Sequence, residues 1–181
     1  MGSASDAPLA KDALKTLKQF GVPYTARVLS AHRSPDEAAA FAKGARAEGY
    51  GAIIALAGKA AHLAGVLASH TILPVIGVPV SAKDLGGLDA LLSTAQMPSG
   101  IPVASVAIDG ATNAALLAIR FLALEDETLA ELLQNHARAL TAKTAEADAA
   151  LQKEIEGLLS RRSRFTRAKR KRCSQPTCRA L

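Results

Sequence analysis

The chain of 181 residues has the length of one ordinary domain, and a composition of 49% hydrophobic and 21% charged residues excludes wholesale disorder. Its net charge of +6 comes from the tail, residues 161–181, which carries nine Lys or Arg and no acidic residue. Positions 1–160 hold 13 basic and 16 acidic residues, so nucleic-acid binding is a question for the tail alone. With only 3% aromatic residues, the body does not favour stacking on bases.

The cysteines and the hydropathy of the chain exclude several classes of protein. Cys173 and Cys178 are the two cysteines, and in the tail they cannot build a disulfide framework or a four-ligand zinc site. A cysteine-free body fits a reducing cytoplasm, where we expect the protein. The opening residues MGSASDAPLAKD do not form a signal peptide, and no apolar run reaches the roughly 18–20 residues of a membrane span. We therefore expect a soluble protein without a membrane partner.

Helix and strand patterns alternate along the chain. Strands are indicated by short apolar runs, and helices by capping residues, a 3.6-residue periodicity and terminal glycines. Ser34, for example, precedes Pro35 and two acidic residues, which is typical of a helix N-terminus. In chain order we predict a helix capped by Ser5 or Asp6 and ended by Gly21, a strand at 24–29, a helix from Ser34 to about 48, a strand at 52–56, a helix at 60–69, a strand at 74–80, a helix at 88–94, a strand at 102–108, and helices at 112–124 and 126–159.

This alternation predicts an α/β fold, in which a doubly wound parallel sheet lies between two layers of helices. Residues 1–160 are expected to form one domain that includes the long C-terminal helix, and 161–181 a disordered basic tail. Ligands bind such sheets at the carboxyl ends of the strands. The loops expected there are 30–36, 57–65 and 81–87, together with residues 2–6.

Residues 2–6, GSASD, are a candidate anion site. They place the hydroxyls of Ser3 and Ser5, with free backbone N–H groups, at a helix N-terminus, where the helix dipole favours an anion. The alternative is a plain N-cap with serines present by chance.

The segment SAHRSPD at 30–36 is more informative, because it presents Ser30, His32 and Arg33 at the end of a strand. Arg33 can hold a phosphate through paired N–H donors. His32 can give or take a proton near neutral pH. The alternative is a surface loop with an incidental histidine.

The segment AGKAAHLAG at 57–65 follows the most apolar strand. Gly58 permits close approach of the backbone to a ligand, which Lys59 or His62 can face. A histidine one turn into an alanine-rich helix is more often a packing or capping residue than a catalyst, so we interpret His62 as structural or supporting. No His, Cys or carboxylate grouping has metal-ligand spacing, so we expect no metal. Neither a GxGxxG nor a GxxxxGK[ST] loop is present.

Together these segments resemble the 5-(carboxyamino)imidazole ribonucleotide mutases of purine biosynthesis. The resemblance is collinear over roughly residues 1–135, and SAHR followed by QMPSGIPV is its most specific part. The matching pieces are MGSASD at 1–6, SAHRSPDEA at 30–38, AGKAAHLAG at 57–65, LPVIGVPV at 73–80, GLDALLSTAQMPSGIPVASVAIDG at 87–110 and NAALLAIRFLAL at 113–124.

The resemblance implies a flavodoxin-like sheet, a homo-octamer and a cofactor-free reaction, in which a carboxylate moves from the exocyclic nitrogen of the phosphoribosyl-imidazole substrate to carbon 4. His32 is implied to be the general acid and base. Ser3, Ser5 and Arg33 are implied to hold the 5′-phosphate. Asp6 is implied to contact the ribose. The other implied substrate contacts are Ser30, Gly58, Lys59, His62 and Leu63.

Two other functions stay open. The related carboxylase makes the same product from free carbon dioxide and the aminoimidazole ribonucleotide, but residues 60–63, AAHL, favour the mutase. A phospho-ligand scaffold without catalysis would not need the whole set of candidate residues. Lys59 stands where glycine is common in the mutases, which bears on the lining of the pocket.

Two features depart from the family. A central strand normally precedes MGS, so we expect the sheet to lack its first strand, with the natural start of the chain about 5–8 residues upstream. The tail, 161–181, resembles nothing in the family. We expect it to be solvated, with non-specific contact to RNA or other polyanions as the alternative and no specific nucleic acid partner.

Overall fold

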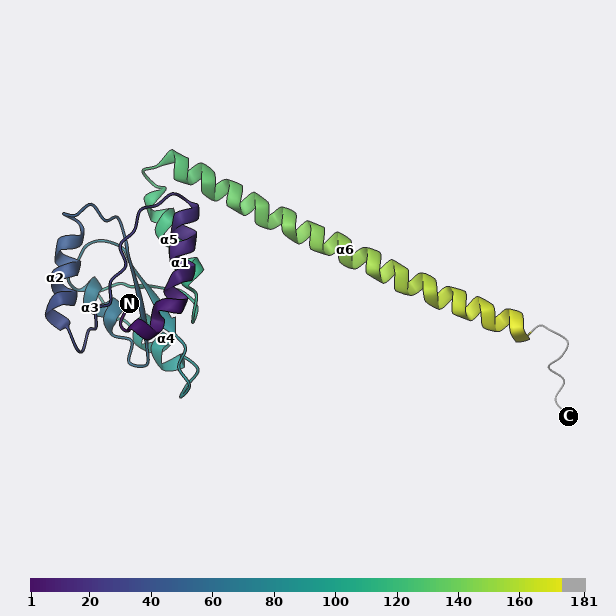
Figure 1. The fold of residues 1–181 in the computed structure, drawn as a ribbon, viewed down its shortest axis with the longest axis horizontal. Helices are drawn as coiled ribbons and strands as arrows, with labels where there is room; N and C mark the ends of the chain where they lie inside the picture. The colour runs from purple at the N-terminus through teal and green to yellow at the C-terminus, as the bar shows by residue number, and fades with distance from the viewer. Residues whose placement is uncertain (174–181) are drawn as a thin grey trace. The chain divides into compact units, whose positions relative to one another are not determined.

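The computed structural model describes the backbone of residues 1–173 and the side chains of residues 1–158. The chain divides into two compact units, Met1–Leu133 and Gln134–Leu181. The first unit carries the sheet and the candidate site. In chain order the elements are η1 (Ala4–Asp6, a 3-10 helix), α1 (Ala7–Gln19), α2 (Pro35–Ala45), β1 (Ile53–Gly58), α3 (Leu63–Ala68), β2 (Val75–Val80), α4 (Leu88–Ala95), β3 (Ala104–Ser105), α5 (Ala111–Leu122) and α6 (Glu127–Cys173) (Figure 1).

Within the described residues, three parallel strands form one sheet in the order β1-β2-β3. β1 and β2 pair along their whole length, from Ile53 opposite Val75 to Gly58 opposite Val80. Their unbroken apolar sequences suit strands that are covered on both faces. α3 and α4 supply the crossovers that parallel strands require. The predicted α/β fold with a parallel sheet is confirmed.

Helices cover both faces of the sheet (Figure 1), and buried alanines line the contacts between helices and sheet. α1 and α5 share one hydrophobic cluster with Leu56 of β1 and Ile76 of β2. α2 and α3 share a second cluster with Ile53, on the opposite face of β1. Ala38 and Ala114 are fully buried in these layers. Small side chains let the helices approach the sheet closely.

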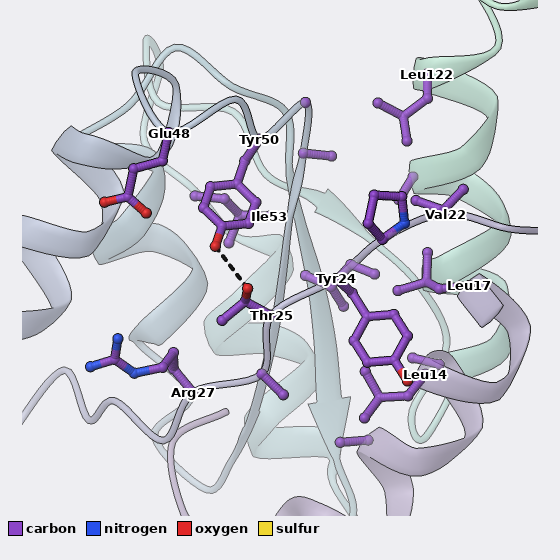
Figure 2. A pocket seen from close by; sticks show the side chains of 18 of the residues that line it. Leu14, Leu17, Val22, Tyr24, Thr25, Arg27, Glu48, Tyr50, Ile53 and Leu122 are labelled. Carbon is purple, nitrogen blue, oxygen red and sulfur yellow. Dashed lines mark hydrogen bonds between the residues drawn. The ribbon is translucent and has the colours of Figure 1, made fainter.

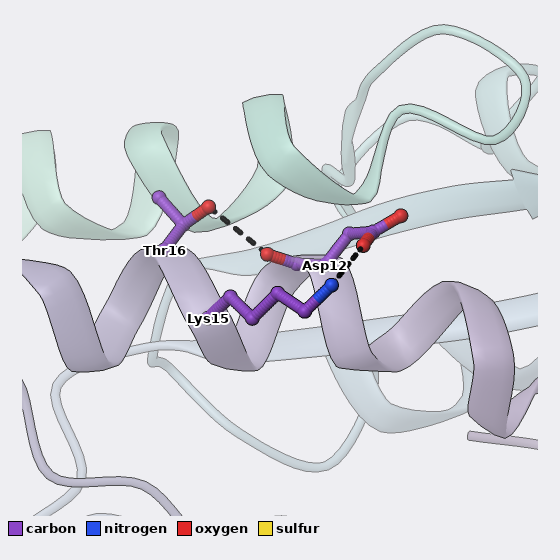
Figure 3. Close-up of polar contacts among 3 residues, drawn as sticks. All are labelled: Asp12, Lys15 and Thr16. Atoms are coloured by element: carbon purple, nitrogen blue, oxygen red, sulfur yellow. Dashed lines mark hydrogen bonds and ion pairs between the residues drawn. The ribbon is translucent and has the colours of Figure 1, made fainter.

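Thr16 is a polar residue inside the layer of α1 and α5. It is 8% exposed, and its hydroxyl donates to the carbonyl of Asp12 one turn earlier, at 2.9 Å (Figure 3). The buried hydroxyl is thereby satisfied without a partner from another element. On the outer side of the helix, Lys15 Nζ lies 3.5 Å from Asp12 Oδ1, an exposed ion pair of small energetic value.

The strand predicted at 24–29 is not confirmed, because this segment of the described chain is extended but belongs to no strand. Its backbone bonds to Met1 alone: the Met1 amino group donates to the Arg27 carbonyl at 2.9 Å, and the Leu29 N–H donates to the Met1 carbonyl at 2.9 Å. A strand requires a series of backbone hydrogen bonds to successive residues of a neighbouring strand. Met1 alone supplies only the first of these partners.

The strand predicted at 102–108 is shorter than expected and is limited to β3. The Val106 N–H still bonds to β2, at 3.1 Å. The next bond comes from the Asp109 N–H to the Pro79 carbonyl at 2.9 Å, one residue later than a regular ladder would place it. An extra residue of this kind interrupts a ladder as a bulge does.

The C-terminal helix is longer than predicted. α6 runs to Cys173 rather than to 159, so the expected disorder is wrong for 161–173; residues 174–181 lie outside the described part. Lys, Arg and Ala are good helix formers, and neither Gly nor Pro occurs between Gly157 and Pro176. The remaining predicted helix ends agree with the structure within three residues. A domain boundary at 160 stays a prediction.

Candidate active site

A cavity of about 420 Å³ lies at the carboxyl ends of β1 and β2, where parallel sheets place their ligands. The loops that follow β1 and β2 line it, together with the amino-terminal loop and the loop before α2. The structure brings all the candidate site residues to this cavity: Ser3, Ser5, Asp6, Ser30, His32, Arg33, Gly58, Lys59, His62 and Leu63.

The amino-terminal loop is ordered by its own side chains. Ser3 Oγ accepts from the Ser5 N–H at 3.3 Å and from the Ser5 hydroxyl at 2.9 Å. The Asp6 carboxylate accepts from the Ser3 N–H and from the Ser5 hydroxyl, both at 3.1 Å, which completes a capping box. Asp6 is the N-cap residue of α1, which is one of the two predicted, but it makes no side-chain cap bond there; the capping box belongs to the preceding 3-10 turn η1, whose N-cap is Ser3. Asp6 is 8% exposed and holds both serines at the cavity.

Arg33 joins the loop before α2 to the amino-terminal loop. Its Nη2 donates to the Gly2 carbonyl at 3.1 Å, and its Nε donates to Ser30 Oγ at 3.4 Å. Ser34 precedes Pro35 at the start of α2 as predicted, but its Oγ accepts from the Ser30 N–H at 2.9 Å and so closes the loop. A guanidinium has five N–H donors, and two of them make these bonds, so an exposed cation with further donors faces the cavity.

The two histidines of the cavity contact each other. Nε2 of His32 lies 2.8 Å from Nδ1 of His62, and the rings meet edge to face with their centroids 4.9 Å apart. One nitrogen must donate and the other accept, so each ring fixes the tautomer and the orientation of its neighbour. The sequence placed both residues at the site, but it gave no signal of this contact.

Lys59 adopts a backbone conformation that lysine rarely takes. Its φ is +56°, in the left-handed region, and its Nζ lies 3.1 Å from Oδ2 of Asp84 in the loop after β2. The preceding residue, Gly58, leaves little room, because a Cβ there would lie 3.3 Å from the Val80 carbonyl oxygen. The ion pair therefore joins the loops that follow two neighbouring strands.

Two residues that the sequence did not single out also shape the cavity. Ser81 lines it, and the Ser81 N–H donates to Oδ1 of Asp109 at 2.9 Å. Asp109 has a φ of +57°, which turns the chain between β3 and α5 back toward β2. A positive φ at aspartate leaves no pattern that separates it from an ordinary loop residue, so this contact was missed.

Within the residues that the structure describes, no group of three or more His, Cys, Asp or Glu side chains is placed to hold a metal ion. The helices of the same residues also lack the combination of length and apolarity needed to cross a bilayer.

The AIR carboxylase family matches residues 1–143, which include every residue of the cavity. The chain belongs to this family. It is 53% identical over 146 residues to the N5-carboxyaminoimidazole ribonucleotide mutase of Pyrococcus horikoshii, covering 81% of this chain and 82% of that protein. It is 55% identical over 148 residues to the enzyme of the same name from Brucella melitensis, covering 81% and 91%.

A solved structure of the same fold is similar to this chain. The crystal structure of Treponema denticola PurE superposes with a TM-score of 0.75 at 31% sequence identity, covering 83% of this chain and 94% of that one. The flavodoxin-like α/β fold and the family resemblance expected from the sequence are both confirmed.

Proposed function

We propose that this protein is a 5-(carboxyamino)imidazole ribonucleotide mutase, an isomerase of purine biosynthesis that moves a carboxylate from the exocyclic nitrogen to carbon 4 of the imidazole. The family and the names of its relatives support this function. The observation that carries it is His32, a proton-transfer group set between a second imidazole and an anion-binding rim in one cavity.

The rim of the cavity suits the 5′-phosphate of the substrate. Ser3, Ser5 and Arg33 all line the cavity, and the guanidinium of Arg33 bonds to the Gly2 carbonyl next to Ser3. Arg33 binds phosphate oxygens through charge-assisted hydrogen bonds, and the start of η1 and α1 adds a favourable dipole. Ser30 positions Arg33 through its Oγ. Asp6 orders the two serines and lies where the ribose follows the phosphate.

One group that gives and then takes a proton is enough for the chemistry. As the N–C bond to the carboxylate breaks, carbon dioxide leaves and His32 protonates the nitrogen. Carbon 4 then attacks the carbon dioxide, a C–C bond forms, and His32 removes the proton from carbon 4. Protons and atoms are balanced between substrate and product, so the reaction consumes no external acid, base or oxidant.

His62 orients His32 for this role. When Nε2 of His32 carries the hydrogen of the 2.8 Å contact, Nδ1 of His62 accepts it, and the imidazole of His32 is held in one orientation in the cavity.

The released carbon dioxide must be kept from water until carbon 4 attacks it. Leu63, which is 2% exposed, and Gly58 at the end of β1 border the cavity with apolar surface and backbone. Lys59 contacts the substrate region from the same loop, and its pair with Asp84 holds the loop after β2 beside it.

The proposal is tested by supplying the carboxyamino substrate with a ¹³C-labelled carboxylate, without added bicarbonate. A mutase converts this substrate. When the reaction is repeated with unlabelled bicarbonate present, the product still retains the label. Turnover that needs the aminoimidazole ribonucleotide and bicarbonate would show a carboxylase instead. Saturable binding of either substrate without turnover would show a scaffold without catalysis.

We further propose a cytoplasmic homo-octamer, as the family resemblance implies. Exposed apolar side chains support self-association of each unit, Leu88 and Leu92 on α4 and Leu151 and Ile155 on α6. Light scattering behind a sizing column measures the mass of the assembly. A monomer at micromolar concentration would contradict this proposal.

The domain is proposed to end at residue 160, with the basic tail dispensable for catalysis. Truncation after Ser160 should leave turnover unchanged and abolish salt-sensitive retention on heparin, since nine of the basic residues lie beyond it. Loss of the oligomer on truncation would show that the tail is structural.

A further inference from the structure

Charge distinguishes the candidate active site from a larger cavity beside β1. The larger cavity, of about 670 Å³, is lined mainly by apolar side chains such as Leu17, and its acidic side chains outnumber its one arginine, Arg27 (Figure 2). In the candidate active site, Arg33 and Lys59 carry fixed positive charges, and Asp6 is the one carboxylate among the described lining residues. An anionic ligand is therefore favoured in the candidate active site and not in the larger cavity.

Arg33 is tied to one side of β1, the side away from β2. The Ile53 N–H donates to the Pro74 carbonyl just before β2, which defines the β2 side. Backbone bonds alternate along a strand, so Leu56, three residues later, bonds on the opposite side, where its carbonyl accepts from the Gly2 N–H at 2.9 Å. The guanidinium of Arg33 donates to the carbonyl of the same Gly2 at 3.1 Å.

Lys59 is tied to the other side of β1. It follows Gly58, the last residue of β1, which pairs with Val80 of β2. Its Nζ lies 3.1 Å from Oδ2 of Asp84, in the loop after β2. Arg33 and Lys59 therefore flank the carboxyl end of β1 from opposite sides, in the cavity that also holds the histidine pair. This arrangement suits a ligand that carries an anion at each of two ends.

The amino group of Lys59 has donors to spare for such a ligand. An ammonium has three N–H donors, and the contact with Asp84 uses one of them. Lys59 lines the cavity and Asp84 does not, so the remaining donors are open to a bound molecule. The two side chains of the pair are 72% and 67% exposed, and an exposed pair of this kind rearranges at little energetic cost.

The backbone at Lys59 gives an independent reason to assign the side chain a role. Its φ of +56° is costly for a residue with a Cβ, whereas glycine adopts this conformation freely. Such outliers gather at functional sites, where the surrounding structure holds them. A glycine here would relieve the strain, but it would also remove the cation from the β2 side of the cavity lining.

We propose that Lys59 binds the carboxylate that the reaction moves, while Arg33 binds the phosphate at the other end of the same molecule. This inference rests on the proposed function, which supplies a ligand with these two anions. The contact is a charge-assisted hydrogen bond from the ammonium to the carboxylate. The flexible four-carbon stem of lysine lets the ammonium follow the carboxylate from the exocyclic nitrogen to carbon 4. While the carbon dioxide is free and uncharged, Asp84 remains as the partner of Lys59.

The experiment compares two ligands that share the ribose 5′-phosphate. One is the product of the proposed reaction, with its carboxylate on carbon 4, and the other is the aminoimidazole ribonucleotide, which has no carboxylate. Calorimetric titration in bicarbonate-free buffer gives Kd for both, and their ratio measures the preference for the carboxylated ligand. The proteins are the wild type, Lys59→Met, Lys59→Arg, Asp84→Asn and the matched control Lys83→Met. Lys83 is exposed on the same loop as Asp84 and lies outside the cavity lining.

Lys59→Met should raise Kd for the carboxylated ligand by about fivefold or more, and change Kd for the other ligand by less than about twofold. Lys59→Arg should keep most of the preference, because it keeps the charge. Lys83→Met should change neither Kd. Added salt should reduce the preference of the wild type and leave that of Lys59→Met unchanged, because the preference is electrostatic.

Asp84→Asn separates ligand binding from a role in holding the two loops together. A loosened loop affects both ligands alike, and the amino group of Lys59 is still present, so this variant should keep the wild-type preference. Equal loss of preference in Lys59→Met and Asp84→Asn would overturn the proposal, as would equal weakening of both ligands by Lys59→Met.

If Lys59→Met does not fold, Lys59→Gly takes its place, because it removes the cation and relieves the positive φ. A wild-type preference in Lys59→Gly would overturn the proposal. Failure of the wild type to bind either ligand would refute the proposed function and this inference with it. Tight binding of both ligands without any dependence on Lys59 would refute this inference alone.

Discussion

Replacing His62 by alanine tests whether the histidine pair serves catalysis. The substitution removes the acceptor that lies 2.8 Å from Nε2 of His32 and leaves the rest of the cavity in place. A hydrogen bond to a charged group contributes about 1.5–3 kcal/mol. Both rings are exposed, so water replaces part of the lost bond and about 1 kcal/mol is expected to remain. That loss lowers kcat by roughly fivefold.

The effect should appear in kcat with little change in KM, because His62 acts on His32 and not on the phosphate. His62→Asn should recover part of the activity, since an amide oxygen can lie near the position of Nδ1. His70→Ala is the matched control, as His70 follows α3 and lies outside the cavity lining. A steady-state assay with the carboxyamino substrate measures all three. Equal kcat values for His62→Ala and His70→Ala would refute the reasoning.

Four further outcomes follow from the same structure. His32→Asn should lower kcat by at least ~10²-fold while substrate still binds; near-normal turnover would remove His32 from the mechanism. Arg33→Ala should raise KM by about tenfold or more through loss of charge-assisted phosphate bonds, and an unchanged KM would place the phosphate elsewhere. Lys59→Gly should raise the unfolding midpoint relative to Lys59→Ala, because both lose the exposed pair with Asp84 but only glycine relieves the positive φ; equal midpoints would mean that the backbone is unstrained. Acetylation of the amino terminus should stabilise the chain most below the lowered pKa of that group, because the buried amino group is then charged in the folded state. Between that pKa and 8.0 the folded state binds fewer protons than the unfolded state, so the unmodified chain should gain stability as pH rises; parallel pH profiles of the two forms would contradict this.

The sheet and the site were predictable because both depend on topology. The runs at 52–56 and 74–80 are apolar without interruption, and such strands pair in parallel when helices connect them. Parallel strands all end at one edge, so the loops after β1 and β2 had to meet there; the loop of His32 follows the extended segment 24–29 and lines the same cavity. The composition of those loops then indicated the chemistry.

The side-chain partners at the site were not predictable in the same way. His32 and His62 lie 30 positions apart, and their contact depends on α3 beginning at Leu63, so that His62 forms the end of the loop rather than a turn of the helix. The predicted start at residue 60 obscured this. Lys59 takes a conformation for which glycine is the usual signal, and a lysine gives none.

Strand prediction failed at the two segments where strand formation depends on pairing with a neighbouring strand rather than on the sequence of the segment itself. Residues 24–29 have an apolar pattern and are extended, but an apolar pattern does not create a ladder. Residues 102–108 bond to β2 at both ends, and the extra residue between Val106 and Asp109 breaks the register. Neither property is encoded in the local propensity of the segment.

Gly2 connects β1 to the candidate site. The Gly2 N–H bonds to Leu56 of β1, and its carbonyl accepts from the guanidinium of Arg33. The next residue, Ser3, begins the capping box that orders the hydroxyls at the proposed phosphate rim. The two serines thus follow two residues, Met1 and Gly2, whose backbone bonds to Leu29 and to Leu56 of β1.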